Sequence, residues 1–211
     1  LGLGALEGEP TLASLAAQLL TLMADPAAAG SSGVDLGEEA RLPAQIATRL
    51  AAHPAPSRSP AAEGAVLLTG ATGFLGAHLL ADQLQRHPQL TVFCLVRADG
   101  AGAAKARVRA NLQQYGLWQE ADAARIIGVP GDLARPCLGF DEATAASLVG
   151  RLGGILHNGA QLSYVAPYGQ LKAANVGGTL AVLELASQAA IPLQFISSTS
   201  VYEAAAYRRQ T

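Results

Sequence analysis

The sequence has few charged residues, few cysteines and no long apolar run. Only 14% of the 211 residues are charged and the formal net charge is −2, so the composition gives no reason to expect nucleic acid or an anionic membrane as a partner. Two cysteines make neither a disulfide framework nor a metal-ligand cluster, which favours a reducing, cytoplasmic setting. No stretch has the length of a membrane span or the layout of a signal peptide. The histidines show no ligand spacing, so no metal is expected.

Half of the residues are hydrophobic, enough to build a sizeable core, and the length suits one α/β domain with an appendage. The spacing of apolar residues predicts an amphipathic helix over 11–23 and a weaker helix over 43–51. Residues 24–33 are rich in Ala, Gly and Ser and predict a linker. The prolines of 53–60 exclude helix and central strand, so we place the domain boundary there.

Strand-like and helix-like runs alternate from residue 64 onward. This alternation predicts an α/β fold: a Rossmann-type, doubly wound parallel sheet with helices on both faces, preceded by a short helical and linker segment. The ligand crevice of such a sheet lies at the carboxyl ends of its strands. After the first strand and its helix, strands are expected at 90–96, 125–129, 154–157 and 193–196, and helices at 103–114, 141–149 and 167–189.

The first strand stops at a glycine-rich turn, with Gly70, Gly73 and Gly76 spaced three apart. Glycines let the backbone approach a ligand closely, and the N–H groups at the start of the following helix face the same space. A pyrophosphate fits such a place. The first gap is one residue wider than in the usual dinucleotide pattern, and a packing turn without a ligand is the alternative.

Arg97 ends the second expected strand, where a dinucleotide-binding domain meets the adenosine ribose. An arginine there favours a 2′-phosphate, whereas an acidic residue favours the free hydroxyl. We therefore expect Arg97 to select NADPH, with Arg107 as a second contact. Lys105 and Arg109 are more simply explained as a solvated helix face. Asp99 leaves NAD as the alternative cofactor.

The assembled motifs resemble the extended short-chain dehydrogenase/reductase superfamily, and within it the thioester reductase domains that end nonribosomal peptide and polyketide synthetases. The segment His157-Asn158-Gly159-Ala160, followed by 164–168, resembles a thioester reductase more than a sugar-nucleotide epimerase. The resemblance covers residues 64–202, and its other motifs are Leu67–Gly76, Cys94–Ala98, Gly131–Leu133, Asn175–Thr179 and Ser197–Tyr202.

This resemblance implies NADPH-dependent reduction of an acyl group held as a thioester on a carrier protein, with release of an aldehyde or an alcohol. It implies Ser198 as the catalytic hydroxyl, with Thr199 as the alternative, although strand-end capping would also explain these residues. A Tyr with a Lys four residues later completes the family's catalytic set. The cofactor-binding residues that it implies are Thr69, Gly70, Thr72, Gly73, Phe74, Leu75, Gly76, Arg97, Arg107, Asp132, Leu133, Asn158, Gly159 and Ala160.

The sequence departs from the family pattern after the fifth expected strand, where no such Tyr/Lys pair occurs up to Thr211. Tyr168 and Lys172 have the right spacing but precede that strand, so we interpret them as helix surface. We expect the sequence to be part of a longer protein. The alternatives are a fatty acyl-CoA reductase or sugar-nucleotide epimerase of the same superfamily, and a non-catalytic cofactor-binding or scaffolding domain.

The N-terminal residues 9–16 resemble the end of a carrier-protein domain, although an unrelated Ala- and Leu-rich helix is an equal alternative. The resemblance divides the chain into a carrier remnant (1–23), a linker and lead-in (24–62) and an NADP-binding Rossmann domain (63–211). It implies a carrier domain upstream in the same polypeptide as partner, and a carrier-bound thioester as substrate.

Overall fold

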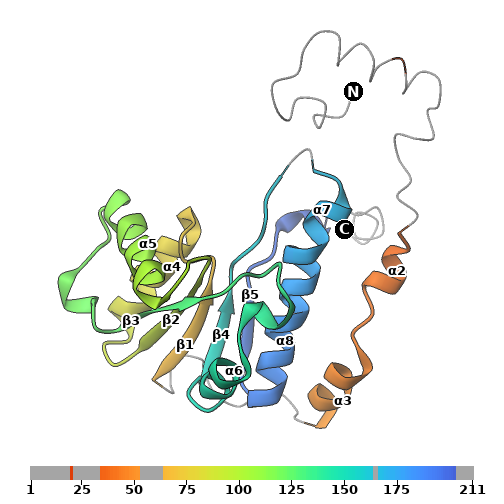
Figure 1. Ribbon diagram of the computed structural model, residues 1–211, viewed down its shortest axis with the longest axis horizontal. Coiled ribbons are helices and arrows are strands. Elements are labelled where there is room, and N and C mark those ends of the chain that lie inside the picture. The colour runs from red at the N-terminus through yellow and green to blue at the C-terminus, as the bar shows by residue number, and fades with distance from the viewer. Residues whose placement is uncertain (1–19, 21–33, 53–63, 164–165, 203–211) are drawn as a thin grey trace.

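The computed structural model describes residues 20, 34–52, 64–163 and 166–202 (Figure 1). The expected helix over 11–23, apart from residue 20, and the proline-rich boundary at 53–60 lie outside this part of the chain, so these two interpretations stay predictions.

Five parallel strands form one sheet in the order β3-β2-β1-β4-β5. Thr69, the last residue of β1, lies opposite Leu95 of β2 and His157 of β4. The strand order reverses between β1 and β4, and in open sheets of this kind ligands bind outside the carboxyl ends of the strands at that point. The strands are β1 (Ala65–Thr69), β2 (Thr91–Val96), β3 (Ile126–Pro130), β4 (Gly154–His157) and β5 (Leu193–Phe195).

Helices cover both faces of the sheet, so the predicted doubly wound fold is confirmed (Figure 1). On one face, α4 (Phe74–Arg86) and α5 (Ala101–Gln114) pack through Leu80, Leu84, Val108 and Leu112. On the other, α6 (Glu142–Val149) and α8 (Gly178–Ala189) pack through residues that include Leu148, Val182 and Leu185.

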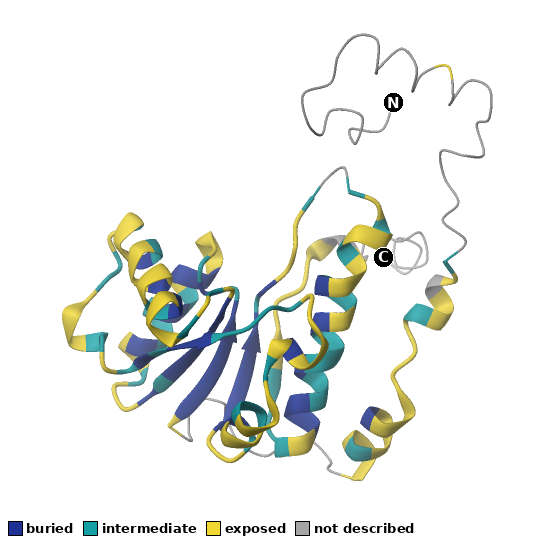
Figure 2. Ribbon diagram, viewed as in Figure 1, coloured by how far each residue is buried: buried dark blue, intermediate teal, exposed yellow. Residues whose placement is uncertain are grey.

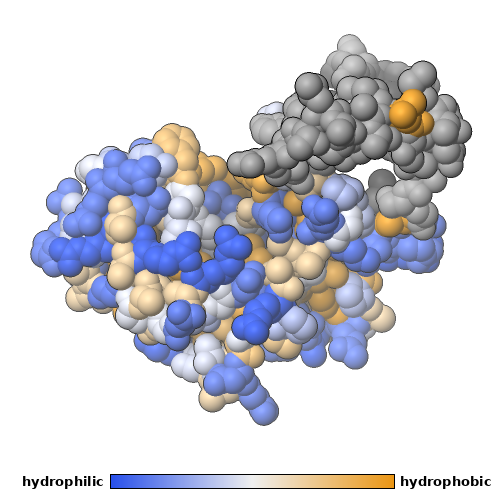
Figure 3. Space-filling view, turned by 45° about the horizontal axis from the view of Figure 1, so that its top comes forward, coloured by the Kyte–Doolittle hydropathy of each residue, from blue (hydrophilic) through white to orange (hydrophobic). Residues whose placement is uncertain are grey.

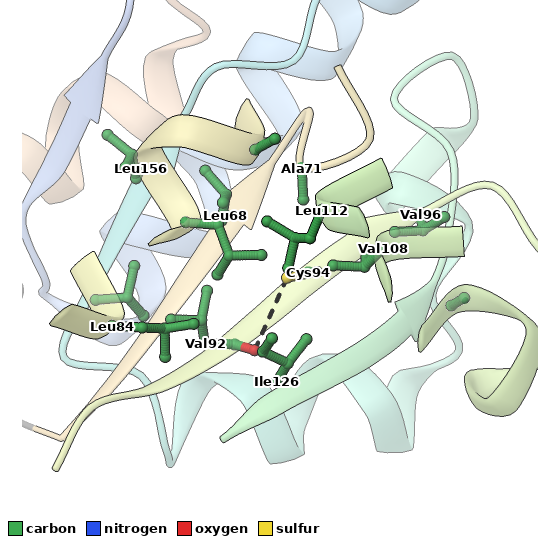
Figure 4. Close-up of a cluster of buried hydrophobic side chains, with 14 of the residues drawn as sticks. Leu68, Ala71, Leu84, Val92, Cys94, Val96, Val108, Leu112, Ile126 and Leu156 are labelled. Carbon is green, nitrogen blue, oxygen red and sulfur yellow. Dashed lines mark hydrogen bonds between the residues drawn. The ribbon is translucent and has the colours of Figure 1, made fainter. Parts of the chain in front are cut away.

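Strands β1, β2 and β4 are the buried centre of the molecule, whereas β5 at the edge is largely exposed (Figure 2). Val66, Leu68 and Val92 meet the α4–α5 layer, whereas Leu67 and Phe93 point to the other face, as the two-residue repeat of a strand requires. Cys94 lies within the first of these clusters, with its Sγ 3.9 Å from the Val92 carbonyl oxygen (Figure 4). Burial raises the pKa of the Cys94 thiol to about 12, so this cysteine has a packing role.

The helix expected over 167–189 is interrupted. It consists of α7 (Tyr168–Lys172), one π-helical turn (Ala173–Gly177) and α8. Within that turn, the side-chain amide of Asn175 accepts a hydrogen bond from Gln161 N (2.7 Å) and donates one to Gln161 O (2.9 Å). The turn is therefore joined to the segment that leaves β4, and such π-turns are frequent near functional sites.

A lead-in segment, residues 34–52, precedes the sheet and contains α2 (Leu36–Glu39) and α3 (Ala44–Ala52). The α3 helix matches the helix predicted over 43–51, whereas α2 was not predicted because it is a single turn. Asp35 caps α2, since its Oδ1 accepts hydrogen bonds from Gly37 N (2.8 Å) and Glu38 N (3.3 Å). The α3 helix contacts α8 and buries Ile46.

Candidate functional site

The glycine turn after β1 lies against the end of β4. Gly70 has a φ of +73°, and a Cβ there would come within 2.9 Å of Asn158 Nδ2 and of the Gly159 backbone. Gly73 N donates to Gly70 O at 3.0 Å, which closes the turn. Position 70 therefore needs glycine for its backbone conformation and for its close contact with the neighbouring strand.

Gly73 and Gly76 have different surroundings. A Cβ at Gly76 would lie 1.9 Å from Gly70 O, so α4 can pack on the turn only with glycine there. A Cβ at Gly73 would meet nothing closer than 3.4 Å, and Gly73 is exposed. Gly73 is also the N-cap of α4, and no side-chain cap bonds to that end of the helix in the described residues. The first N–H groups of α4 thus border the exposed side of the turn, which suits an anion.

Asn111 on α5 holds this turn from the side. Its Nδ2 donates to Ala71 O and to Gly73 O, both at 3.1 Å. The sequence interpretation did not include Asn111 among the site residues. Asparagine is a poor helix former, so its presence at position 111, next to the buried Leu112, was a signal of a special role. Its partner Ala71 could not be recognised, because it lies 40 residues away in the chain.

The hydroxyl of Thr69 ties the ends of β1 and β4 together. Thr69 Oγ1 accepts hydrogen bonds from Asn158 N (3.1 Å) and Gly159 N (2.8 Å), and it lies 2.7 Å from His157 Nδ1. Since the oxygen accepts from both amides, we assign its proton to the bond with Nδ1. Thr69 is fully buried, so the structure places it beneath the glycine turn.

His157 continues this chain of hydrogen bonds. With Nδ1 accepting, Nε2 carries the ring proton and donates to Thr179 Oγ1 (3.1 Å), whose own hydroxyl donates to Asn175 O (2.6 Å). Burial lowers the pKa of His157 to about 4, so the ring is neutral in neutral solution. His157 is therefore a packed, hydrogen-bonded residue rather than a base exposed to a ligand.

The other expected contacts on this side differ in exposure. Leu133 packs between two glycines: a Cβ at Gly159 would come within 2.7 Å of Leu133 Cδ1, and one at Gly178 within 2.8 Å of Leu133 O. Asn158 is half-buried and Ala160 is exposed. Leu133 thus packs between β4 and α8, whereas Asn158 and Ala160 border the open edge.

A charged cleft of about 590 Å³ lies at the ends of β2 and β3. Arg97 and Arg107 both line it, and the Arg107 guanidinium donates to the Arg97 carbonyl oxygen. Arg135 also lines the cleft, a residue that the sequence interpretation did not include. The acidic side chains in the lining are Asp99 and Asp132, and Asp132 Oδ1 accepts from Ala134 N at 2.9 Å. Figure 3 shows strongly hydrophilic residues gathered on the half of the molecule that β3, α4 and α5 form.

The remaining helix-start residues Thr72, Phe74 and Leu75 surround the turn without being buried. Phe74 is 65% exposed and makes T-shaped contacts with the rings of His78 (4.8 Å between centroids) and Tyr115 (5.4 Å). Thr72 is half-buried. The structure therefore brings the whole predicted turn to one edge of the sheet.

The expected catalytic hydroxyls follow β5, at the same edge. Ile196 N donates to His157 O at 2.9 Å, and the Phe195 ring lies 5.4 Å from the His157 imidazole. Ser198 is exposed, and Thr199 is exposed at the start of a 3₁₀ turn, Thr199–Tyr202. The structure thus places both hydroxyls beyond the end of the strand that neighbours β4.

In the described residues no helix combines the length and the apolar character needed to cross a membrane. Within the same residues, no group of three His, Cys, Asp or Glu side chains is suited to hold a metal ion.

Comparison with known proteins finds one matching family and several similar proteins. A model of an NAD-binding family described as "Male sterility protein" matches residues 68–211. A component of the linear gramicidin synthase of Brevibacillus parabrevis is 49% identical over 135 residues, which are 64% of this chain and 3% of that protein. The L-2-aminoadipate reductase large subunit of Penicillium chrysogenum is 42% identical over 151 residues, 71% of this chain and 11% of that protein.

Among solved structures, the terminal R domain from the myxalamid PKS-NRPS biosynthetic pathway superposes with a TM-score of 0.71 at 40% identity. The match covers 78% of this chain and 41% of that one. The chain therefore spans less than half the length of each of these three relatives.

Proposed function

The chain belongs to the NAD-binding family described as "Male sterility protein", and on that premise we propose that it binds NADPH for a reductase that releases an acyl or peptidyl thioester from a carrier protein. The observation that carries the proposal is the placement of the glycine turn, the Asn158–Ala160 segment and the arginine cleft along one edge of the sheet. The relatives named above include a reductase and a terminal R domain, which supports the same class of reaction.

The residues present fit a dinucleotide. At Gly73 the space that a Cβ would occupy is open to a ligand. The uncapped start of α4 offers N–H donors to a pyrophosphate there. Thr72, Phe74, Leu75, Asn158 and Ala160 border this space, and we propose that they contact the cofactor. Thr69, Gly70, Gly76, Leu133 and Gly159 act from beneath by holding the turn and β4 in register.

The cleft at β2 and β3 supports NADPH over NADH. Arg97 is exposed, and its guanidinium can form paired hydrogen bonds with the oxygens of a 2′-phosphate. Arg107 donates to the Arg97 carbonyl and lines the same cleft, so we propose that it adds a second positive charge. Asp132 bonds to the backbone of its own turn and is thereby oriented along the lining.

The chemistry requires a donor aimed at the carbonyl oxygen of the thioester, where negative charge develops. When bound, the nicotinamide supplies the hydride. We propose that Ser198 donates the hydrogen bond to that oxygen, with Thr199 as the alternative. Residues 1–23 are proposed as the end of a carrier domain, residues 24–62 as the linker and lead-in, and residues 63–211 as the NADPH-binding domain.

The test is NADPH absorbance decay with a carrier-bound or CoA-bound acyl thioester, in a polypeptide that continues past residue 211. Ser198→Ala should slow hydride transfer and leave NADPH affinity unchanged, with Thr199→Val as the matched variant. The 211-residue chain should bind the cofactor without detectable turnover, because a missing general acid alone costs a factor of about 10² to 10⁴. Absence of turnover in the longer polypeptide with any acyl thioester would instead favour the non-catalytic cofactor-binding alternative.

A further inference from the structure

The Tyr168/Lys172 pair, which has the spacing of a catalytic pair, binds a carboxylate of the lead-in. Tyr168 OH donates to Glu39 Oε2 at 3.0 Å, and Lys172 Nζ donates to Glu39 Oε1 at 2.6 Å. The two side chains are four residues apart on α7, so they project from the same side of the helix and meet both oxygens of one carboxylate.

The charge states of these groups agree with this geometry. The hydrogen bond from Lys172, and then that from Tyr168, holds the pKa of Glu39 below its usual value. Glu39 in turn raises the pKa of Lys172 through the same bond, whereas burial and then the hydrogen bond to Glu39 raise the pKa of Tyr168. At neutral pH the contact is therefore a carboxylate held by an ammonium group and a protonated phenol.

A further side-chain contact joins α3 of the lead-in to α8. The Arg49 guanidinium of α3 bonds to the Glu184 carboxylate, which lowers the pKa of Glu184. Ile46, on the same helix, is only 3% exposed. In chain order the lead-in has the acidic Glu39 and then the basic Arg49, whereas the domain has the basic Lys172 and then the acidic Glu184. This polarity selects one direction, because a reversed segment would bring like charges together.

We propose that residues 34–52 are a docking strap for the α7–α8 surface and that Tyr168 and Lys172 are its carboxylate receptor. The contacts of Glu39 place α2 beside α7, which follows the segment leaving the carboxyl end of β4 (Figure 1). The strap therefore holds the start of the lead-in at the edge of the sheet that carries the site. If the proposed function holds, a carrier domain attached there is tethered where its thioester reacts.

The strap can be tested in the 211-residue chain by hydrogen exchange of the backbone amides of 44–52. Glu39→Gln and Lys172→Met should each accelerate exchange several-fold, and the double variant should add little, because both remove the same contact. Glu38→Gln is the control, since that side chain is 60% exposed and pairs with Arg41 inside the lead-in. Equal exchange in Glu39→Gln, Glu38→Gln and the wild type would overturn the receptor.

Swapping the charges of Arg49 and Glu184 tests the direction and register of the strap on the α7–α8 surface. Arg49→Glu should accelerate exchange of 44–52, and adding Glu184→Arg should restore it toward the wild-type rate. Ile46→Asp should accelerate it by roughly tenfold or more, because a charge replaces a buried aliphatic side chain. Exchange in β1 and β2 should stay unchanged in each case. If the double variant exchanges as fast as Arg49→Glu alone, the proposal that residues 34–52 dock on α8 is contradicted.

The activity of a longer polypeptide with its carrier domain separates the strap from the proposed function. Glu39→Gln should slow reduction of the carrier-bound thioester while sparing a CoA thioester supplied in solution. Slowing of both substrates by Lys172→Met, with exchange of 44–52 unchanged, would instead make the Tyr168/Lys172 pair catalytic and overturn the receptor. If no thioester is reduced at all, the proposed function fails, and the exchange measurements still decide the strap.

Discussion

Two parts of the same sheet edge differ in how they are built. The junction of β1 and β4 consists of backbone atoms and buried hydroxyl and imidazole groups, with Thr69 at 0% and His157 at 1% exposure. The lining of the cleft at β2 and β3 includes the exposed charged side chains of Arg97, Arg107 and Arg135. The first part depends on shape and on satisfied hydrogen bonds, whereas the second depends on charge in contact with water.

This difference separates two effects of substitution. Buried backbone contacts cannot shift without disturbing their neighbours, so changes in the junction should act on folding and, through it, on every ligand. Exposed arginines contribute little to the stability of the fold. Substituting them should change ligand affinity according to whether the ligand carries a 2′-phosphate.

Gly76→Ala and Gly73→Val should separate folding from binding within one turn. A Cβ at position 76 would lie 1.9 Å from Gly70 O, so Gly76→Ala should lower the free energy of unfolding by about 3 kcal/mol or more. A side chain at position 73 meets no close protein atom, so Gly73→Val should melt near the wild type and lose cofactor binding. Circular dichroism melting and calorimetric titration give the two readouts. Normal NADPH binding by Gly73→Val would show that the turn is only structural.

The neutral His157 should make folding depend on pH between about 6.5 and 4. Burial lowers its pKa from 6.5 to about 4, so in this range the unfolded state binds a proton that the folded state does not. Stability should therefore fall as the pH falls, by about 3 kcal/mol over the whole range. Urea unfolding at several pH values measures this loss.

The matched variant for this prediction is His157→Gln, in which the slope between pH 6.5 and 4.5 should be much smaller. The carboxylates with lowered pKa values, Glu39, Asp141 and Glu184, contribute to the slope only below about pH 4.5. An unchanged slope in His157→Gln would contradict the assignment.

Arg97→Ala should change the choice of cofactor without changing the fold. A charge-assisted hydrogen bond contributes about 1.5–3 kcal/mol, so NADPH affinity should fall by about ten- to a hundredfold while NADH affinity changes little. Calorimetric titration of both cofactors measures the difference, with Arg109→Ala as control because Arg109 bonds to Glu120 on the surface. Equal affinities in the wild type would refute the preference, as would equal losses in the variant.

Asn111→Ala tests whether the glycine turn after β1 also depends on a side chain of α5. Two hydrogen bonds to the turn are lost, at Ala71 O and Gly73 O, so we expect a loss of about 1 kcal/mol and a few-fold weaker binding of both cofactors. Gln113→Ala on the exposed face of the same helix is the control. Loss of NADPH binding alone would assign Asn111 to the cleft rather than to the turn.

Much of the fold could be predicted because its signals are local. Hydrophobic runs and glycines gave the five strands, and the doubly wound arrangement follows from their alternation with helices. The interruption of the expected 167–189 helix could not be predicted, because it accompanies the pairing of Asn175 with Gln161, 14 residues earlier. The α2 helix was not predicted because a single turn is too short to show helical periodicity, and the pairing of its Glu39 with Lys172 of α7 lies 133 residues away in the chain.

The candidate site divides in the same way. The sequence alone determined the turn at Gly70–Gly76 and the arginine after β2, because glycine freedom and strand-end position can be recognised from neighbouring residues. The folded structure was needed to show which glycine is exposed, which hydroxyl supports β4, and that Asn111, Arg135 and Glu39 take part. Those roles depend on atoms that are far apart in the chain and meet only when the sheet has formed, so no local pattern encodes them.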